Sequence, residues 1–126
     1  MEKTFTKTCV VTPEMLATAV GSGSVEVLAT PMVAALLEGA AAELAQKELP
    51  EGWTTVGGKI AIEHLCPTVT GVKVSATATL TEVDGRVYRF SLEATDNAGV
   101  IARGAHERVS VEASRFLSKA QARAKG

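Results

Sequence analysis

The fold of this chain is decided by the stretch Val27-Leu-Ala-Thr-Pro-Met-Val-Ala-Ala-Leu-Leu-Glu-Gly-Ala-Ala-Ala42, in which a single residue is charged. Thr30 and Pro31 begin a helix in the usual way, with a hydroxyl at the N-cap and proline at the first helical position. Alanine and leucine extend the helix to about Lys47, where Leu49-Pro-Glu-Gly52 ends it. We therefore predict one long helix of small residues.

The charged residue of this stretch is Glu38, which lies on the helix face of Ala34, Ala35, Ala41 and Ala42. Removing a carboxylate from water costs several kcal/mol unless the group is paired or neutralised. Two interpretations stay open: a glutamate on a partly exposed alanine face, or a carboxylate in a cleft that a substrate can approach. The residues expected to pack on a sheet lie on another face: Met32, Leu36 and Gly39.

From residue 53 onward the hydrophobic pattern has the period of two that is typical of strands. We predict four consecutive antiparallel strands, with a hairpin at Asp84-Gly85 and a turn at Asp96–Gly99. The last strand spans Val100–Val111. The inner faces of the first three are predicted to carry Val56, Gly58, Ile60, Ile62 and His64; Val72, Val74, Ala76, Ala78 and Leu80; and Tyr88, Phe90, Leu92 and Ala94.

A further strand is predicted at Thr4–Val11, before the helix, with a short helical turn from Thr12 and a loop at Val20–Ser24. The sum is one α+β domain spanning 1–126, in which a single helix packs against an antiparallel sheet. Its residues 114–126 form a basic, helix-compatible tail to which the sequence assigns no function. Because one helix covers little of a sheet, we expect two copies to pair as a homodimer.

Composition narrows the function classes. The formal net charge of -1 gives no sign of a nucleic-acid or membrane partner. The first residues contain no apolar targeting segment, and no uncharged stretch is long enough to span a bilayer. Cys9 and Cys66 fit reduced thiols in a cytoplasmic protein. Zinc spacing, a phosphate-binding glycine loop and a dinucleotide fingerprint are all missing from the sequence, so no metal or cofactor is expected.

Other residues are candidates for chemistry. His64 lies on an apolar strand face and is either a core residue or a general acid and base near neutral pH. Cys66 as a nucleophile with His64 is a rival arrangement. Gly57-Gly58 either lets the backbone approach a ligand or marks a bulge. His106-Glu-Arg108 could supply a cation for a phosphate or carboxylate, although charges on an edge strand are ordinary.

The element order resembles the hotdog fold, in which an antiparallel sheet wraps a long helix and two protomers complete the active sites. More narrowly, the chain resembles the fluoroacetyl-CoA-specific thioesterase family from about Phe5 to Phe116. The resemblance rests on three segments in order: Val27–Glu38, Gly57-Gly-Lys-Ile-Ala-Ile-Glu-His64 and Gly104-Ala-His-Glu-Arg108.

The resemblance implies that Thr30, Glu38 and His64 form the catalytic group of an acyl-CoA thioesterase. It places Gly57, with Gly58 beside it, close to the acyl group, and Arg108 where it helps to hold the site or the ligand. Coenzyme A would enter as part of the substrate, and the product would be a small or short-chain acid. Glu38 would act as nucleophile or as base.

One departure from the family bears on specificity. The family's phenylalanine-bearing lid falls before the threonine, where this chain has Val20-Gly-Ser-Gly-Ser-Val-Glu-Val27 without an aromatic residue. We therefore expect a related thioesterase without fluoroacetyl selectivity. Two other functions stay open at this stage: a hotdog acyl-CoA hydratase or dehydratase, whose usual local Asp and His pair is missing, and a non-catalytic acyl-CoA or metabolite-binding protein.

Overall fold

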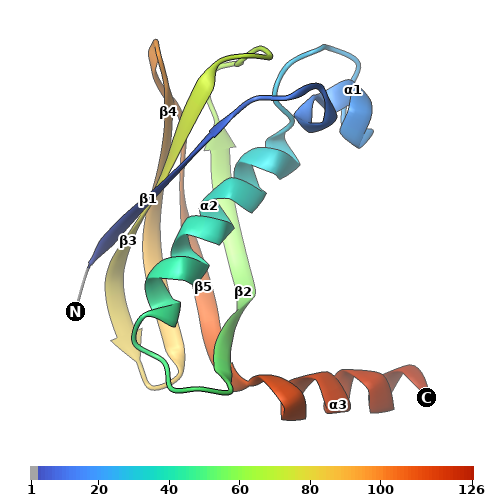
Figure 1. Cartoon of the computed structure of the whole chain (residues 1–126), viewed down its shortest axis with the longest axis vertical. Coiled ribbons are helices and arrows are strands. Elements are labelled where there is room, and N and C mark those ends of the chain that lie inside the picture. Colours follow the sequence, from blue (N-terminus) through green and yellow to red (C-terminus); the bar gives the residue numbers. More distant parts are fainter. Residues whose placement is uncertain (1–2) are drawn as a thin grey trace.

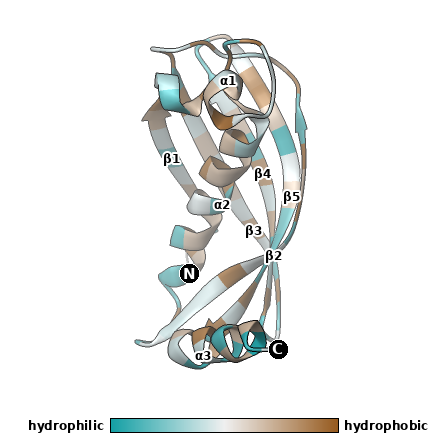
Figure 2. Ribbon diagram, turned by 90° about the vertical axis from the view of Figure 1, so that its right-hand side faces the viewer, coloured by the Kyte–Doolittle hydropathy of each residue, from teal (hydrophilic) through white to brown (hydrophobic). Residues whose placement is uncertain are grey.

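A five-stranded antiparallel sheet bends around one long helix, α2 (Figures 1 and 2). The computed structural model describes residues 3–126, so the first two residues of the predicted domain lie outside the described part. The α+β class and the wrapped helix are confirmed. The elements are β1 (Thr4–Val10), the 3-10 turn η1 (Pro13–Met15), α1 (Ala17–Val20), α2 (Thr30–Gln46), β2 (Trp53–His64), β3 (Lys73–Asp84), β4 (Val87–Asp96), β5 (Gly99–Glu112) and α3 (Ala113–Ala124).

The strand order in the sheet is β1-β3-β4-β5-β2, which corrects the predicted succession of four neighbouring strands. Strands β3, β4 and β5 do form a meander through two tight turns, including the predicted hairpin at Asp84-Gly85. The eight residues between β2 and β3 carry the chain across the sheet, so β2 pairs with β5. Consequently β5 is an inner strand, and β1 and β2 form the edges.

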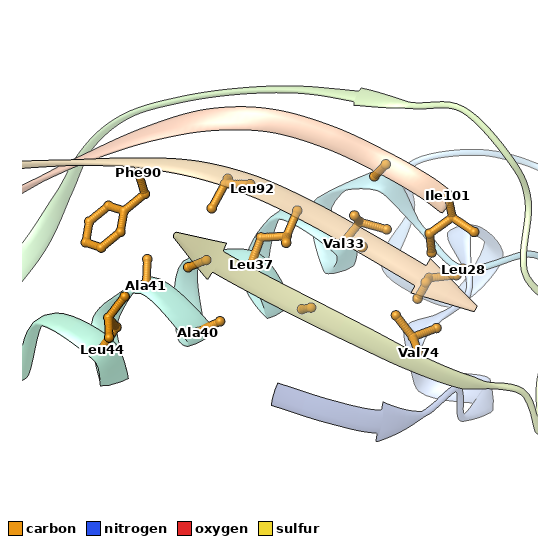
Figure 3. Packing of buried hydrophobic residues seen from close by; sticks show 14 of the residues in the cluster. Leu28, Val33, Leu37, Ala40, Ala41, Leu44, Val74, Phe90, Leu92 and Ile101 are labelled. Carbon is orange, nitrogen blue, oxygen red and sulfur yellow. The ribbon is translucent and has the colours of Figure 1, made fainter. Parts of the chain in front are cut away.

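The core lies between α2 and the inner face of the sheet (Figure 3). Alternate residues of β3 and β4 are buried as predicted, from Val74 to Leu80 and from Tyr88 to Ala94. The sequence predicted that the face of α2 with Met32, Leu36 and Gly39 packs on the sheet. This prediction is wrong, because Met32 and Leu36 are only partly buried at the margin of the core. The residues of α2 that the sheet fully covers are Val33, Leu37, Ala40, Ala41, Leu44 and Ala45.

A bulge in β2 changes which residues face the helix. Gly57 pairs with Arg108 and Lys59 with Glu107, so Gly58 is an extra residue in the ladder. Because one inserted residue reverses the alternation of side chains, the residues before the bulge face inward at odd positions and those after it at even positions. Thr55 and Gly57 therefore join Ile60, Ile62 and His64 on the inner face. The prediction that Val56 and Gly58 lie on that face is wrong.

Helices α1 and α3 lie at opposite ends of the sheet. Helix α1 precedes the glycine-rich loop, and Leu16 beside it forms an isolated bridge with Leu28. Helix α3 continues directly from β5 at the end where β2 begins, and it extends away from α2 (Figure 1). In residues 3–126, no helix is both long and apolar enough to cross a membrane.

Candidate active site

The start of α2 brings Thr30 and His64 together. The structure places Ala29 at the N-cap, without a side-chain cap bond, and Thr30 is the first helical residue. The predicted N-cap role of Thr30 is therefore wrong by one position. Its hydroxyl is free to bond elsewhere, and Oγ1 lies 2.8 Å from Nδ1 of His64 at the end of β2. A hydroxyl that the helix does not use thus orients the imidazole.

His64 keeps one ring nitrogen without a protein partner. Its Nε2 atom is buried and makes no hydrogen bond within the described residues. Such a nitrogen is costly to leave unpaired, and positions of this kind are common at functional sites. Cys66 lines a shallow hollow beside His64, but the imidazole bonds to Thr30 through Nδ1. The geometry therefore favours a Thr30–His64 pair over the alternative Cys66–His64 pair.

Farther along α2, Glu38 lies directly over the backbone of Gly57. A Cβ atom at position 57 would stand 2.7 Å from Glu38 Oε2, closer than real Cβ contacts come. The Glu38 side chain is 40% exposed, so one side of the carboxylate is open to solvent or a ligand. Gly58, by contrast, has ordinary space around its Cα. Only the first glycine of the pair is required for the carboxylate to sit where it does.

Arg108 supplies a fixed cation next to this carboxylate. Its Nη1 atom lies 4.0 Å from Glu38 Oε2, and its side chain is 10% exposed. The Thr55 side chain and main chain hold the guanidinium, with Nε donating to Oγ1 at 2.8 Å and Nη2 donating to the carbonyl oxygen at 2.9 Å. Burial lowers the pKa of Arg108, and the charge of Glu38 opposes that shift. The guanidinium nevertheless stays charged near neutral pH.

His106 completes the support of Arg108. Nη1 of Arg108 lies 3.1 Å from His106 Nε2, and His106 Nδ1 lies 2.7 Å from the Lys59 carbonyl oxygen. Because a guanidinium can only donate and a carbonyl can only accept, Nε2 must be the acceptor and Nδ1 must carry the proton. Burial lowers the pKa of His106, and the charge of Arg108 lowers it further. A neutral imidazole therefore fixes the arginine.

Sequence reasoning did not find the roles of Thr55 and His106. The run at 106–108 predicted a cation near the site, and Arg108 fills that role. Thr55 gave no local signal, because its contact with Arg108 depends on the pairing of β2 with β5 across 53 positions of sequence. Thr55 shares its face with Gly57 by strand alternation, and the bulge at Gly58 then brings that face to the same side as His64.

The structure separates the predicted catalytic residues into two groups. Thr30 and Glu38 are eight residues apart on α2, which is about 12 Å along the helix axis. Gly57, which lies under Glu38, and His64 are six ladder positions apart on β2, or roughly 20 Å. Within one copy of the chain, Glu38 and His64 therefore belong to separate groups. Each copy carries a carboxylate half-site at Glu38 and an imidazole half-site at His64.

Comparisons with known proteins agree with this fold. Residues 11–114 match the family described as fluoroacetyl-CoA-specific thioesterase. Fluoroacetyl-CoA thioesterase of Streptantibioticus cattleyicolor is 32% identical over 94 residues, which cover 75% of this chain and 68% of the relative.

Solved structures extend the comparison. A threonine-to-alanine variant of the fluoroacetyl-CoA thioesterase in complex with fluoroacetate superposes with a TM-score of 0.92, at 27% identity and with 98% of each chain covered. A hot-dog-like protein from Thermanaerovibrio acidaminovorans gives a TM-score of 0.86 at 27% identity, with 95% of this chain and 89% of that chain covered. The expected hotdog fold is therefore confirmed.

Proposed function

This chain belongs to the fluoroacetyl-CoA-specific thioesterase family, and we propose that it hydrolyses small or short-chain acyl-CoA thioesters to a free acid and coenzyme A. The predicted enzyme class, a thioester hydrolase, is confirmed by the family match and by the curated relative. The observation that carries the proposed chemistry is the Glu38 carboxylate, which is held over Gly57 beside a buried guanidinium and keeps an open side.

Glu38 has two possible roles in breaking the thioester. As a nucleophile, Glu38 adds to the carbonyl carbon, the carbon–sulfur bond breaks, and water then hydrolyses the resulting anhydride. As a base, Glu38 takes a proton from the water that attacks the carbonyl. In both roles the thiolate of coenzyme A leaves and receives a proton. Arg108 would hold the carboxylate in place while its exposed edge faces the acyl group.

His64 is the proposed proton carrier. Its imidazole would give a proton to the leaving thiolate and recover one from the attacking water. The hydrogen bond between Thr30 and Nδ1 of His64 would fix the ring orientation, as a second group orients the base in other hydrolytic sites. Backbone N–H groups at the start of α2 would stabilise negative charge that develops on the carbonyl oxygen. These roles require Glu38 and His64 to act on one thioester.

Two copies of the chain can bring the separated half-sites together. Strand β2 is a twelve-residue edge strand, and a long edge of this kind readily pairs with another strand. The Glu38 half-site lies at Gly57, near the middle of β2, and the His64 half-site lies at its last residue. A two-fold axis between them would therefore place the Glu38 half-site of one copy against the His64 half-site of the other, twice per dimer. We infer that the active enzyme is a dimer with composite sites.

The register of this pairing follows from side-chain alternation and charge. If the axis passes through Ala61, Ile60 of one copy faces Ile62 of the other on the inner side, and His64 reaches the Gly57-Gly58 bulge. On the outer side, Lys59 then faces Glu63, an opposite-charge pair that favours this register. Both of these side chains belong to exposed residues in the single copy.

The acyl group is expected to be small and not selected for fluorine. Residues 20–27, which precede Thr30, contain no aromatic side chain to close over the acyl group, and Val20 and Val25 in this segment are exposed. A panel of acetyl, propionyl, butyryl and fluoroacetyl thioesters of coenzyme A tests this expectation. Similar kcat/KM values for acetyl-CoA and fluoroacetyl-CoA are expected, and a strong preference for the fluorinated substrate would contradict it.

The central experiment measures thiol release from this panel by the unaltered protein, Glu38→Gln and His64→Ala. We expect hydrolysis well above background for the first and a large loss of kcat for both variants. Three proteins with the same rate would refute the assigned site. Single turnovers in water enriched in heavy oxygen, with mass spectrometry of the protein, then distinguish the roles of Glu38. An acyl adduct or heavy oxygen on Glu38 supports attack by the carboxylate, whereas heavy oxygen only in the released acid, with no adduct, supports the base.

A further inference from the structure

Helix α3 carries an unusual concentration of positive charge. Residues 113–126 contain four of the thirteen Lys and Arg residues and none of the fourteen Asp and Glu residues. Arg115, Lys119 and Arg123 recur every four positions and therefore lie along one face of the helix. Like charges at this spacing destabilise a helix, and the effect is relieved when an anion binds. Figure 2 shows hydrophilic and hydrophobic residues interleaved along α3.

The start of this cationic face opens onto a hollow between α3 and the end of the sheet. Three cationic and two aromatic side chains line it, and one carboxylate also lies there and accepts a hydrogen bond from Ser114. The guanidinium of Arg86 stands 5.7 Å from the centre of the Trp53 ring. These side chains belong to Trp53, Arg86, Glu112, Arg115, Phe116 and Lys119.

The hollow lies within reach of the carboxylate half-site. Trp53 and Gly57 are four residues apart on β2, before the bulge, and so they face the same side of the sheet about 13 Å apart. The extended pantetheine arm of coenzyme A can span this distance. A thioester held beside Glu38 would therefore carry its phosphorylated nucleotide to the neighbourhood of Trp53.

We propose that this hollow binds the 3′-phosphorylated ADP end of coenzyme A, an inference that rests on the proposed thioesterase function. Arg86, Arg115 and Lys119 would pair with the phosphates through charge-assisted hydrogen bonds. The adenine would stack on the flat face of Trp53 or Phe116. A nucleotide fits the combination of cations and aromatic rings around one hollow, whereas cations alone would suit any polyanion.

The test uses the position of Trp53, the single tryptophan of the chain, as a built-in reporter. Adenosine 3′,5′-bisphosphate, which contains no thioester, is titrated while tryptophan fluorescence is recorded. The test variant is Arg115→Glu/Lys119→Glu. The control Arg123→Glu/Lys125→Glu changes the net charge equally at the far end of α3 but does not alter the hollow. We expect saturable binding to the unaltered protein and the control, and a dissociation constant about tenfold higher for the test variant.

Kinetics provide the second readout. The test variant should raise KM for acetyl-CoA about tenfold at constant kcat and leave acetyl-pantetheine, which lacks the nucleotide, unchanged. The titration does not depend on hydrolysis, so it tests the binding site separately from the enzymatic activity. If the protein binds the nucleotide but releases no thiol, the binding site is supported and the proposed thioesterase function is refuted. The inference is overturned if the bisphosphate does not bind, if both double variants weaken it equally, or if the test variant loses affinity only for vesicles of phosphatidylserine and phosphatidylcholine.

Discussion

The carboxylate of Glu38 occupies the space that a side chain at position 57 would need. A Cβ atom there would stand 2.7 Å from Glu38 Oε2, and the same atom would lie 3.4 Å from His106 Cε1 and 3.6 Å from Arg108 Nη1. Glycine at this position thus allows the helix carboxylate and the strand guanidinium to meet over bare backbone. The lack of a side chain at position 57 is therefore what allows the Glu38 carboxylate to take the position that the proposed hydrolysis needs.

Gly57→Ala should therefore move the carboxylate without unfolding the protein. The added methyl group displaces Glu38 by about 1 Å, and a misplacement of that size can reduce a catalytic rate about a hundredfold. We expect kcat for acetyl-CoA to fall to that extent, while circular dichroism stays unchanged. Gly58→Ala is the matched control, because its Cβ would meet neighbours at 3.7 and 3.8 Å. If kcat falls equally in both variants, the loss comes from a disturbance of strand β2 and not from a displaced Glu38 carboxylate.

Composite sites predict rescue between two inactive proteins. A dimer that contains one Glu38→Gln copy and one His64→Ala copy has one doubly altered site and one intact site. Mixed subunits, unfolded and refolded together at equal amounts, should regain about a quarter of the unaltered activity, because half of the dimers are mixed and each has one working site. Thiol release measures this directly. Activity that stays at the level of the separate variants would place each site within one chain.

The fork geometry of Arg108 should matter more than its charge. Lysine at this position keeps the charge but cannot donate at once to Thr55 and His106 as the guanidinium does. We expect Arg108→Lys to lower kcat about tenfold to a hundredfold through loss of position. Arg103→Lys, on the exposed outer face, serves as the control and should change little. Full activity in Arg108→Lys would reduce the role of Arg108 to a simple point charge.

The buried imidazole of His106 should make stability depend on pH. Burial, together with the neighbouring Arg108 charge, lowers the pKa of His106 in the folded state below its ordinary 6.5. As the pH falls below about 6.5, His106 therefore binds a proton in the unfolded chain while it stays neutral in the folded chain. The free energy of unfolding should decrease there by at most about 1.4 kcal/mol per pH unit, until the folded-state pKa is reached.

Urea unfolding between about pH 5 and pH 7.5 measures this slope. His106→Gln can still accept from Arg108 but does not titrate, and it should flatten the profile in that window. Glu38 and Arg108, the charged groups that face His106, remain in place in the variant. If the free energy of unfolding changes with pH equally in both proteins, groups other than His106 cause the pH dependence.

Charge exchange tests the proposed strand register. In the Lys59→Glu variant, two acidic residues would face each other on each side of the two-fold axis, at positions 59 and 63. This repulsion should weaken the dimer about threefold to tenfold. The double variant Lys59→Glu/Glu63→Lys restores opposite charges and should recover the original affinity. Sedimentation equilibrium gives the dissociation constants. Failure of the second substitution to compensate would exclude the register centred on Ala61.

Local patterns were sufficient for the long helix and the strands, although they did not predict the short helix α1. The small-residue run around Glu38, the alternation in β3 and β4, and the turn at Asp84-Gly85 were predicted from neighbours in sequence, because helix and strand periods are local properties. The same locality explains the errors. The start of α2 shifted by one residue, and the inner residues before the bulge were assigned to the wrong face, since neither feature changes the hydrophobic pattern.

What the amino-acid sequence determined alone is the set of elements and the residue types near the chemistry: an acid on the long helix, a histidine at a strand end, and an arginine on the last strand. The tertiary structure decided where these three side chains lie relative to one another. Pairing of β2 with β5 anchors Arg108 through Thr55 and His106, and the rise per residue along α2 and β2 holds Glu38 and His64 apart. These relationships depend on contacts between segments distant in sequence, where strand spacing and helix geometry set distances that no local pattern encodes.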